Sequence, residues 1–81
     1  MEFYLLDVKS VVKAHGTELA FDYINTYHDY NTVLKEALVL STKDTTVDVS
    51  VHKWILKPDG TQEHAEGKDS VPYHYQNPNR V

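Results

Sequence analysis

The chain has 81 residues, no cysteine and a net charge of −4 at pH 7. This length indicates one domain, and the lack of cysteine excludes disulfides, thiol nucleophiles and cysteine-ligated zinc. An acidic chain is not attracted as a whole to phosphate backbones. No apolar run approaches the about 20 residues of a membrane helix, and the N-terminal residues lack the pattern of a secretory signal. We therefore expect a cytoplasmic protein that does not enter a membrane.

The stretch from Phe3 to His28 predicts a β-hairpin closed by a turn at His15-Gly16. When Ala14 faces Thr17, opposite charges meet on one face and apolar or aromatic residues meet on the other. Each good cross-strand pair contributes about 0.2–1 kcal/mol, and a slip by one residue would turn the apolar set to the other face. The predicted pairs are Lys13–Glu18, Lys9–Asp22, Val12–Leu19, Val8–Tyr23 and Tyr4–Tyr27.

The second half of this hairpin also fits a helix. Ala20, Tyr23, Ile24 and Tyr27 have the spacing of one helical face. We favour the strand because the segment is rich in aromatic and β-branched residues and because its pairing with the first strand is chemically consistent.

A helix is predicted from Asn31 to Thr42. Asn31 can cap its first turn, with Asp29 as the alternative cap. The apolar residues form one broad face that is suited to packing on a sheet. That face comprises Val33, Leu34, Ala37, Leu38, Leu40 and Ser41.

A third strand is predicted from Thr45 to Lys57, and its apolar phase changes near its middle. Val47, Val49 and Val51 alternate regularly, but Trp54 and Leu56 follow on the opposite parity. A β-bulge at His52-Lys53 would turn Trp54 inward and keep one face buried, and we favour this interpretation. Without the bulge, Trp54 stands on the other face with Leu56, His52 and His64.

The sequence Lys57-Pro58-Asp59-Gly60-Thr61 is typical of a hairpin turn. The returning strand, Thr61 to Glu66, is polar, as expected at the edge of a sheet. The register of a three-residue loop opposes Leu56 to Gln62, Trp54 to His64 and His52 to Glu66.

These elements predict an α+β fold with the order β-β-α-β-β. We expect a four-stranded antiparallel sheet in the order 2-1-3-4, with one helix packed on one face. A single domain would span residues 1–66, and residues 67–81, which lack an apolar pattern, would form a flexible C-terminal tail. One helix cannot cover the whole sheet, so apolar residues such as Leu5, Val11 and Ile24 would stay partly exposed and favour a homodimer.

The sequence offers no convincing catalytic or metal centre. His52, His64 and Glu66 could share one face of the second hairpin, but HxH and HExxH spacings are absent, so we predict no metal. Asp22, His28 and Asp29 do not have the spacing of a catalytic pair or triad. We therefore expect neither enzymatic activity nor a cofactor. The tyrosines at 4, 23, 27 and 30 could form a stacking platform, but the first three are better explained as core residues with hydroxyls at its rim.

The most specific functional prediction is a protein-binding or regulatory domain with an unknown partner or a second copy of the chain. An exposed tryptophan with an aliphatic neighbour is a common interface anchor. The alternative is single-stranded nucleic-acid binding, because lysines flank the tryptophan in this hairpin. The candidate binding residues are Trp54, Leu56, His52, His64, Lys53 and Lys57.

Overall fold

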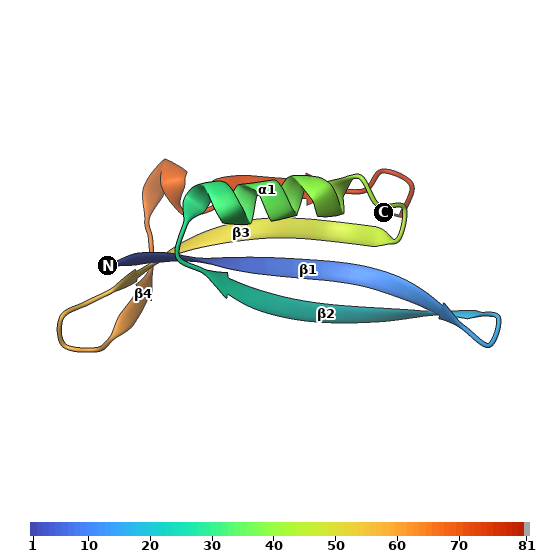
Figure 1. Cartoon of the computed structure of the whole chain (residues 1–81), viewed down its shortest axis with the longest axis horizontal. Helices are drawn as coiled ribbons and strands as arrows, with labels where there is room; N and C mark the ends of the chain where they lie inside the picture. Colours follow the sequence, from blue (N-terminus) through green and yellow to red (C-terminus); the bar gives the residue numbers. More distant parts are fainter. Residues whose placement is uncertain (81) are drawn as a thin grey trace.

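The computed structural model describes residues 1–80 and contains one sheet and one α-helix (Figure 1). Its elements are β1 (Glu2–Ala14), β2 (Thr17–Tyr27), α1 (Tyr30–Ser41), β3 (Thr46–Leu56), β4 (Gln62–His64), the 3₁₀ turn η1 (Gly67–Asp69) and β5 (Tyr73–Gln76). The strands lie in the order β2-β1-β3-β4, all antiparallel, and β5 pairs with the edge of β3 that β4 also uses. The predicted α+β class and strand order are confirmed.

The first hairpin forms in the predicted register. Ala14 faces Thr17 at the turn, Val8 faces Tyr23, and the ladder runs unbroken from there to the Tyr4–Tyr27 pair. His15 and Gly16 both have positive φ angles, 53° and 79°, as a tight two-residue turn requires. The helical alternative for the second half of the hairpin is therefore wrong.

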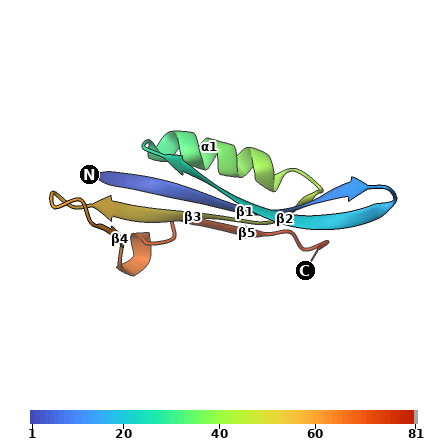
Figure 2. The same cartoon turned by 90° about the horizontal axis from the view of Figure 1, so that it is seen from below.

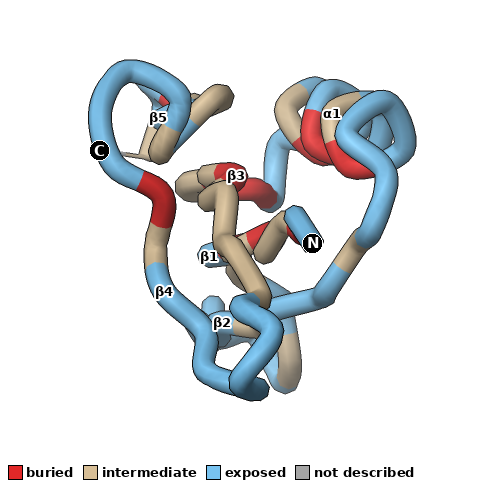
Figure 3. Tube along the Cα trace, turned by 90° about the vertical axis from the view of Figure 1, so that its left-hand side faces the viewer, coloured by how far each residue is buried: buried red, intermediate tan, exposed pale blue. Residues whose placement is uncertain are grey.

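Helix α1 packs on one face of the sheet through the predicted stripe of Val33, Ala37 and Leu40 (Figure 3). Two details differ from the prediction. The N-cap is Asp29 and not Asn31, because the Asp29 carboxylate accepts the Thr32 backbone N–H at 2.9 Å. Leu38 lies beside the stripe and is 49% exposed.

The bulge predicted at His52-Lys53 is wrong. The ladder between β1 and β3 is continuous from Glu2–Ile55 to Lys9–Asp48, and its irregularity lies between Lys9 and Ser10. The side chains of β3 therefore alternate between the two faces without interruption, and Trp54 lies on the face opposite α1.

The edge partner of β3 changes at the place where its apolar phase changes, and no bulge is needed there. Strand β5 pairs with residues 48–51 of β3, whereas β4 pairs with residues 54–56. Val49 and Val51 are fully buried in the core that α1 covers. Beyond them the buried side chains lie on the other face, where Phe3 is 8% exposed and stacks on Trp54. The buried side chains thus change from one face to the other along the strand, and the sequence pattern has the same change.

The prediction of a structureless tail is wrong for residues 67–80. Strand β5 lies beside β3 (Figure 2). Tyr73 and Tyr75 pack against the core. The Tyr73 hydroxyl lies 2.6 Å from the Ser41 hydroxyl of α1. Asn77, only 4% exposed, then ties the chain end to the segment before β3. Two tyrosines of a segment without an apolar pattern thus complete the core.

The molecule is elongated, about 49 × 21 × 20 Å, because the first hairpin extends past the other strands (Figures 1 and 2). Strand β1 pairs with β3 only as far as Ser10 but with β2 as far as Ala14. None of the helices in residues 1–80 has the length and apolar character that crossing a membrane requires.

Candidate binding face

The candidate site lies on the sheet face opposite α1. Leu6 and Val8 point toward the helix, so the alternating residues of β1 point the other way. On that second face Phe3 is opposite Trp54, and Leu5 is opposite His52. Ile24 of β2 lies on the same face, since it is opposite Asp7.

These side chains surround a shallow hollow of about 330 Å³. Its apolar part comes from three strands, and Ile24 is the most exposed member, at 60%. Its polar part consists of one carboxyl group and two imidazoles. The lining residues are Leu5, Asp7, Ile24, His52, Trp54 and His64. The hollow thus combines an apolar floor with a few polar groups, which is typical of binding sites.

Trp54 forms the wall of the hollow toward β4. Its ring stacks on Phe3 with 6.4 Å between centroids and meets the edge of His64 at 5.3 Å. The indole Nε1 is buried, yet it has no hydrogen-bond acceptor among the described residues. An unsatisfied buried donor costs about 1–3 kcal/mol, so this ring position is not optimal for the isolated chain.

The two histidines belong to one directed hydrogen-bond chain. A carbonyl oxygen can only accept, so His64 Nδ1, at 2.9 Å from the Ala65 oxygen, carries a proton. With both rings neutral, His64 Nε2 accepts from His52 Nδ1 at 3.2 Å. His52 Nε2 then accepts the Ser50 hydroxyl proton at 3.1 Å. Every ring nitrogen has a partner when both imidazoles are neutral.

The surroundings of His52 favour its neutral form. Burial lowers the pKa of its imidazole, and the neighbouring His64 lowers the pKa further, although the Asp7 carboxylate opposes both effects. The hollow therefore presents a neutral His52 at physiological pH. Protonation would place a charge next to a second imidazole.

The predicted His52–Glu66 pair is wrong, because the described ladder between β3 and β4 ends at Trp54–His64. Within residues 1–80, no three side chains of His, Asp or Glu are grouped as metal ligands would be. The two histidines are instead bonded to one another.

The structure separates the other predicted site residues from the hollow. Leu56 shares the strand parity of Trp54 but lines a different hollow at the chain end, with Met1, Lys57 and Pro58. Lys53 points to the helix side, and its ammonium lies 3.3 Å from the Glu2 carboxylate. Lys57 pairs with Glu63 at 2.8 Å. Trp54, His52 and His64 therefore line one hollow together, and the two lysines do not flank it.

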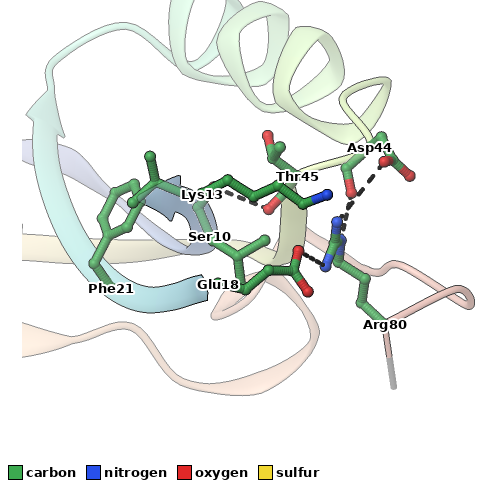
Figure 4. A pocket seen from close by; sticks show the side chains of 9 residues that line it. Ser10, Lys13, Glu18, Phe21, Asp44, Thr45 and Arg80 are labelled. Atoms are coloured by element: carbon green, nitrogen blue, oxygen red, sulfur yellow. Dashed lines mark hydrogen bonds and ion pairs between the residues drawn. The ribbon is translucent and has the colours of Figure 1, made fainter. Parts of the chain in front are cut away.

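A larger hollow, about 730 Å³, lies beside the projecting part of the first hairpin (Figure 4). Its charged groups are largely paired with each other. Arg80 Nη1 lies 2.9 Å from the Glu18 carboxylate, and Arg80 Nε donates to the Asp44 carbonyl at 2.6 Å. Ser10 donates its hydroxyl to the Thr45 carbonyl. These bonds fasten the chain end to the hairpin and leave few polar groups for a ligand.

Sequence reasoning named Leu5 and Ile24 as partly exposed but did not assign them to a site with Trp54, and it missed Phe3 and Asp7. The alternation of residues along the strands did contain this information. With the strand order 2-1-3-4, the odd residues of β1 lie between Ile24 and His52 on one face. No family model matches this chain, and comparisons with curated proteins and with solved structures likewise find no significant similarity.

Proposed function

We propose that this chain is a small protein-binding domain, and that the Trp54 hollow receives an apolar anchor side chain of its partner. The observation that supports this most directly is the position of Trp54 on the sheet face opposite α1, beside the exposed Ile24. Tryptophan in a half-buried hollow is a frequent centre of binding energy.

The state of the indole strengthens the proposal. Its Nε1 is buried without an acceptor, so a small rotation of the ring toward an incoming backbone carbonyl would satisfy a donor that the free chain leaves unpaired. Binding would then gain a hydrogen bond as well as apolar contact. The two imidazoles and Asp7 at the rim would orient the polar groups that flank the anchor.

The charges favour a protein partner over nucleic acid. The two lysines of the alternative hypothesis are paired with carboxylates, and Lys53 points away from the face that carries Trp54. Single-strand binding combines an aromatic platform with a basic groove on one surface, and here these lie on opposite sides of the sheet.

The proposal can be tested with a random peptide library selected against the whole chain. We expect enriched peptides to carry a large apolar residue and to bind with an affinity that Trp54→Ala lowers about 30-fold or more, measured by anisotropy of the labelled peptide. Val71→Ala is the matched control, because Val71 is exposed and lies outside the lining of the hollow. It should change affinity less than about twofold.

Two results would contradict the proposal. Selected peptides could bind Trp54→Ala as tightly as the parent, with circular dichroism showing that the variant is folded. Alternatively, the chain could bind single-stranded DNA in a gel-shift assay at low salt and release the DNA by about 0.2 M salt, which is the signature of phosphate contacts.

A further inference from the structure

The outer edge of β2 is long, regular and unprotected. The strand has 11 residues, and its register with β1 is continuous. Natural sheets usually protect such edges with lysine, proline, a bulge or a short strand. The segment Thr17–Tyr27 contains no lysine, arginine, proline or glycine. This edge is therefore suited to pairing with another strand.

The turn determines which backbone groups point outward. Ala14 and Thr17 flank a two-residue turn and so exchange both hydrogen bonds. Alternation then directs the odd residues of β2 toward β1 and the even residues toward the free edge. The Val11 N–H donates to Thr45, which confirms the same alternation on β1. The outward groups belong to Glu18, Ala20, Asp22, Ile24 and Thr26.

The acidic side chains on this edge already have basic neighbours in their own chain. Glu18 is paired with Arg80 at 2.9 Å, and Asp22 lies directly opposite Lys9. Their charges are thus partly balanced before any second strand arrives. The remaining exposed groups of the edge include Leu19, Phe21 and Ile24, all more than 40% accessible.

We propose that a second copy of this chain pairs with the β2 edge, antiparallel, on a two-fold axis at Ile24. Ile24 then faces Ile24 of the second copy, and Asp22 faces Thr26. On the helix side Phe21 faces Tyr27. Apolar or aromatic side chains thus meet at Ile24–Ile24 on one face and at Phe21–Tyr27 on the other, and the Asp22 carboxylate meets a hydroxyl.

Other symmetric registers are poorer. An axis at Asp22 opposes two carboxylates, and an axis at Ala20 opposes Asp22 to Glu18, which like-charge repulsion disfavours. An axis at Phe21 opposes Ile24 to Glu18, and an axis at Tyr23 opposes Ile24 to Asp22. The axis at Ile24 is the symmetric arrangement of this central segment that satisfies both charge and hydrophobicity.

This pairing would also bring the Trp54 hollows of the two copies together. The dimer itself does not depend on the peptide-binding function proposed above. A two-fold axis perpendicular to the sheet keeps both hollows on the same face. Ile24 lines each hollow, so the two would adjoin across the Ile24 pair. The dimer would present one continuous apolar surface with two tryptophans.

Light scattering after gel filtration tests the assembly. We expect a mass near twice 9.3 kDa at high concentration and dissociation on dilution. Ile24→Lys places two ammonium groups face to face at the axis and should weaken the dimer about tenfold or more. Val71→Lys introduces the same charge at another exposed apolar site and should leave the dimer unchanged. Trp54→Ala should also leave it unchanged, which separates this proposal from peptide binding.

Cysteine substitution tests the register, since the chain has no cysteine of its own. A bonded antiparallel pair has a Cα separation of about 5.5 Å, within the range of a disulfide. Ile24→Cys should therefore form a covalent dimer on mild oxidation, while Ala20→Cys should not. A monomer up to about 1 mM, a dimer that Ile24→Lys does not weaken, or equal cross-linking at both positions would overturn the proposal.

Discussion

Replacing Asn77 with alanine tests whether the C-terminal segment is part of the fold. The Asn77 amide is buried and donates to two carbonyls, Thr46 at 2.8 Å and Asp44 at 3.3 Å. Its oxygen accepts the Asn79 N–H at 2.9 Å. Alanine removes all three bonds, including the buried one to the Thr46 carbonyl. The expected loss in the free energy of unfolding is about 1–3 kcal/mol.

Thermal unfolding followed by circular dichroism measures this loss. For a domain of this size, 1 kcal/mol corresponds to about 4–8 °C in Tm, so Asn77→Ala should lower Tm by about 5–20 °C. Asn79→Ala is the matched control, because the Asn79 side chain is exposed and only its backbone takes part in the turn. If both variants melt within about 2 °C of the parent, the segment does not stabilise the fold and the reasoning is refuted.

Three further predictions concern the core, the β5 contact and pH. Leu6→Ala, at a fully buried site, should cost about 2–5 kcal/mol, whereas the exposed Leu38→Ala should cost less than about 1 kcal/mol; equal denaturant midpoints would contradict the assigned helix face. Tyr73→Phe removes the hydroxyl bonded to Ser41 and should cost about 1 kcal/mol in urea unfolding, while a Tyr75→Phe control should cost less. Because the pKa of His52 is lowered in the folded state, the unfolded chain takes up a proton first, so stability should fall as pH drops below the ordinary value of about 6.5. The fall in urea midpoint should be smaller in His52→Gln, and an identical pH dependence in both proteins would contradict this.

The sequence predicted those parts of the fold in which local signals agree. The first hairpin has complementary pairs along its whole length and a turn that accepts positive φ, so turn chemistry and pairing identify one register. The second turn is equally clear, because Asp59 bonds Thr61 and Gly60 takes φ 89°. These local agreements identified the two hairpins, and the strand order also required the pairing of the third strand with the first, which the structure contains.

The C-terminal strand could not be predicted in this way. Strand β5 has only four residues, and its stability depends on contacts with distant elements. Tyr73 reaches α1, and Asn77 bonds residues 44 and 46, more than 30 positions earlier. A short polar segment with two tyrosines has no periodicity of its own, so sequence patterns alone assigned it to a tail.

The residues of the candidate site were named from the sequence, but the face on which Trp54 lies was not predicted correctly, for a related reason. A change of apolar phase in a central strand has two structural causes: a bulge that restores one buried face, or a change in which face its neighbours cover. Sequence periodicity does not distinguish them. Here Val49 and Val51 are buried on the face that α1 covers, whereas Trp54 packs on Phe3 on the other face. The edge partner changes from β5 to β4 between these positions. The phase change at His52-Lys53 coincides with the exchange of neighbours, and it places Trp54 beside His64 and away from α1.

This position of Trp54 predicts a specific optical signal. The His64 ring packs at right angles to the indole, with 5.3 Å between the ring centroids, and shields it from solvent, whereas a tryptophan turned inward under α1 would have no histidine beside it. The chain has one tryptophan, so its emission reports this site alone. We expect His64→Ala to shift the emission to longer wavelength, because it removes the ring that packs against the indole, with circular dichroism unchanged. The matched control is His15→Ala, in the distant hairpin turn, which should leave the emission unchanged. An emission maximum that is the same in both variants would mean that Trp54 does not lie against His64 and would remove the hollow from consideration as the binding site.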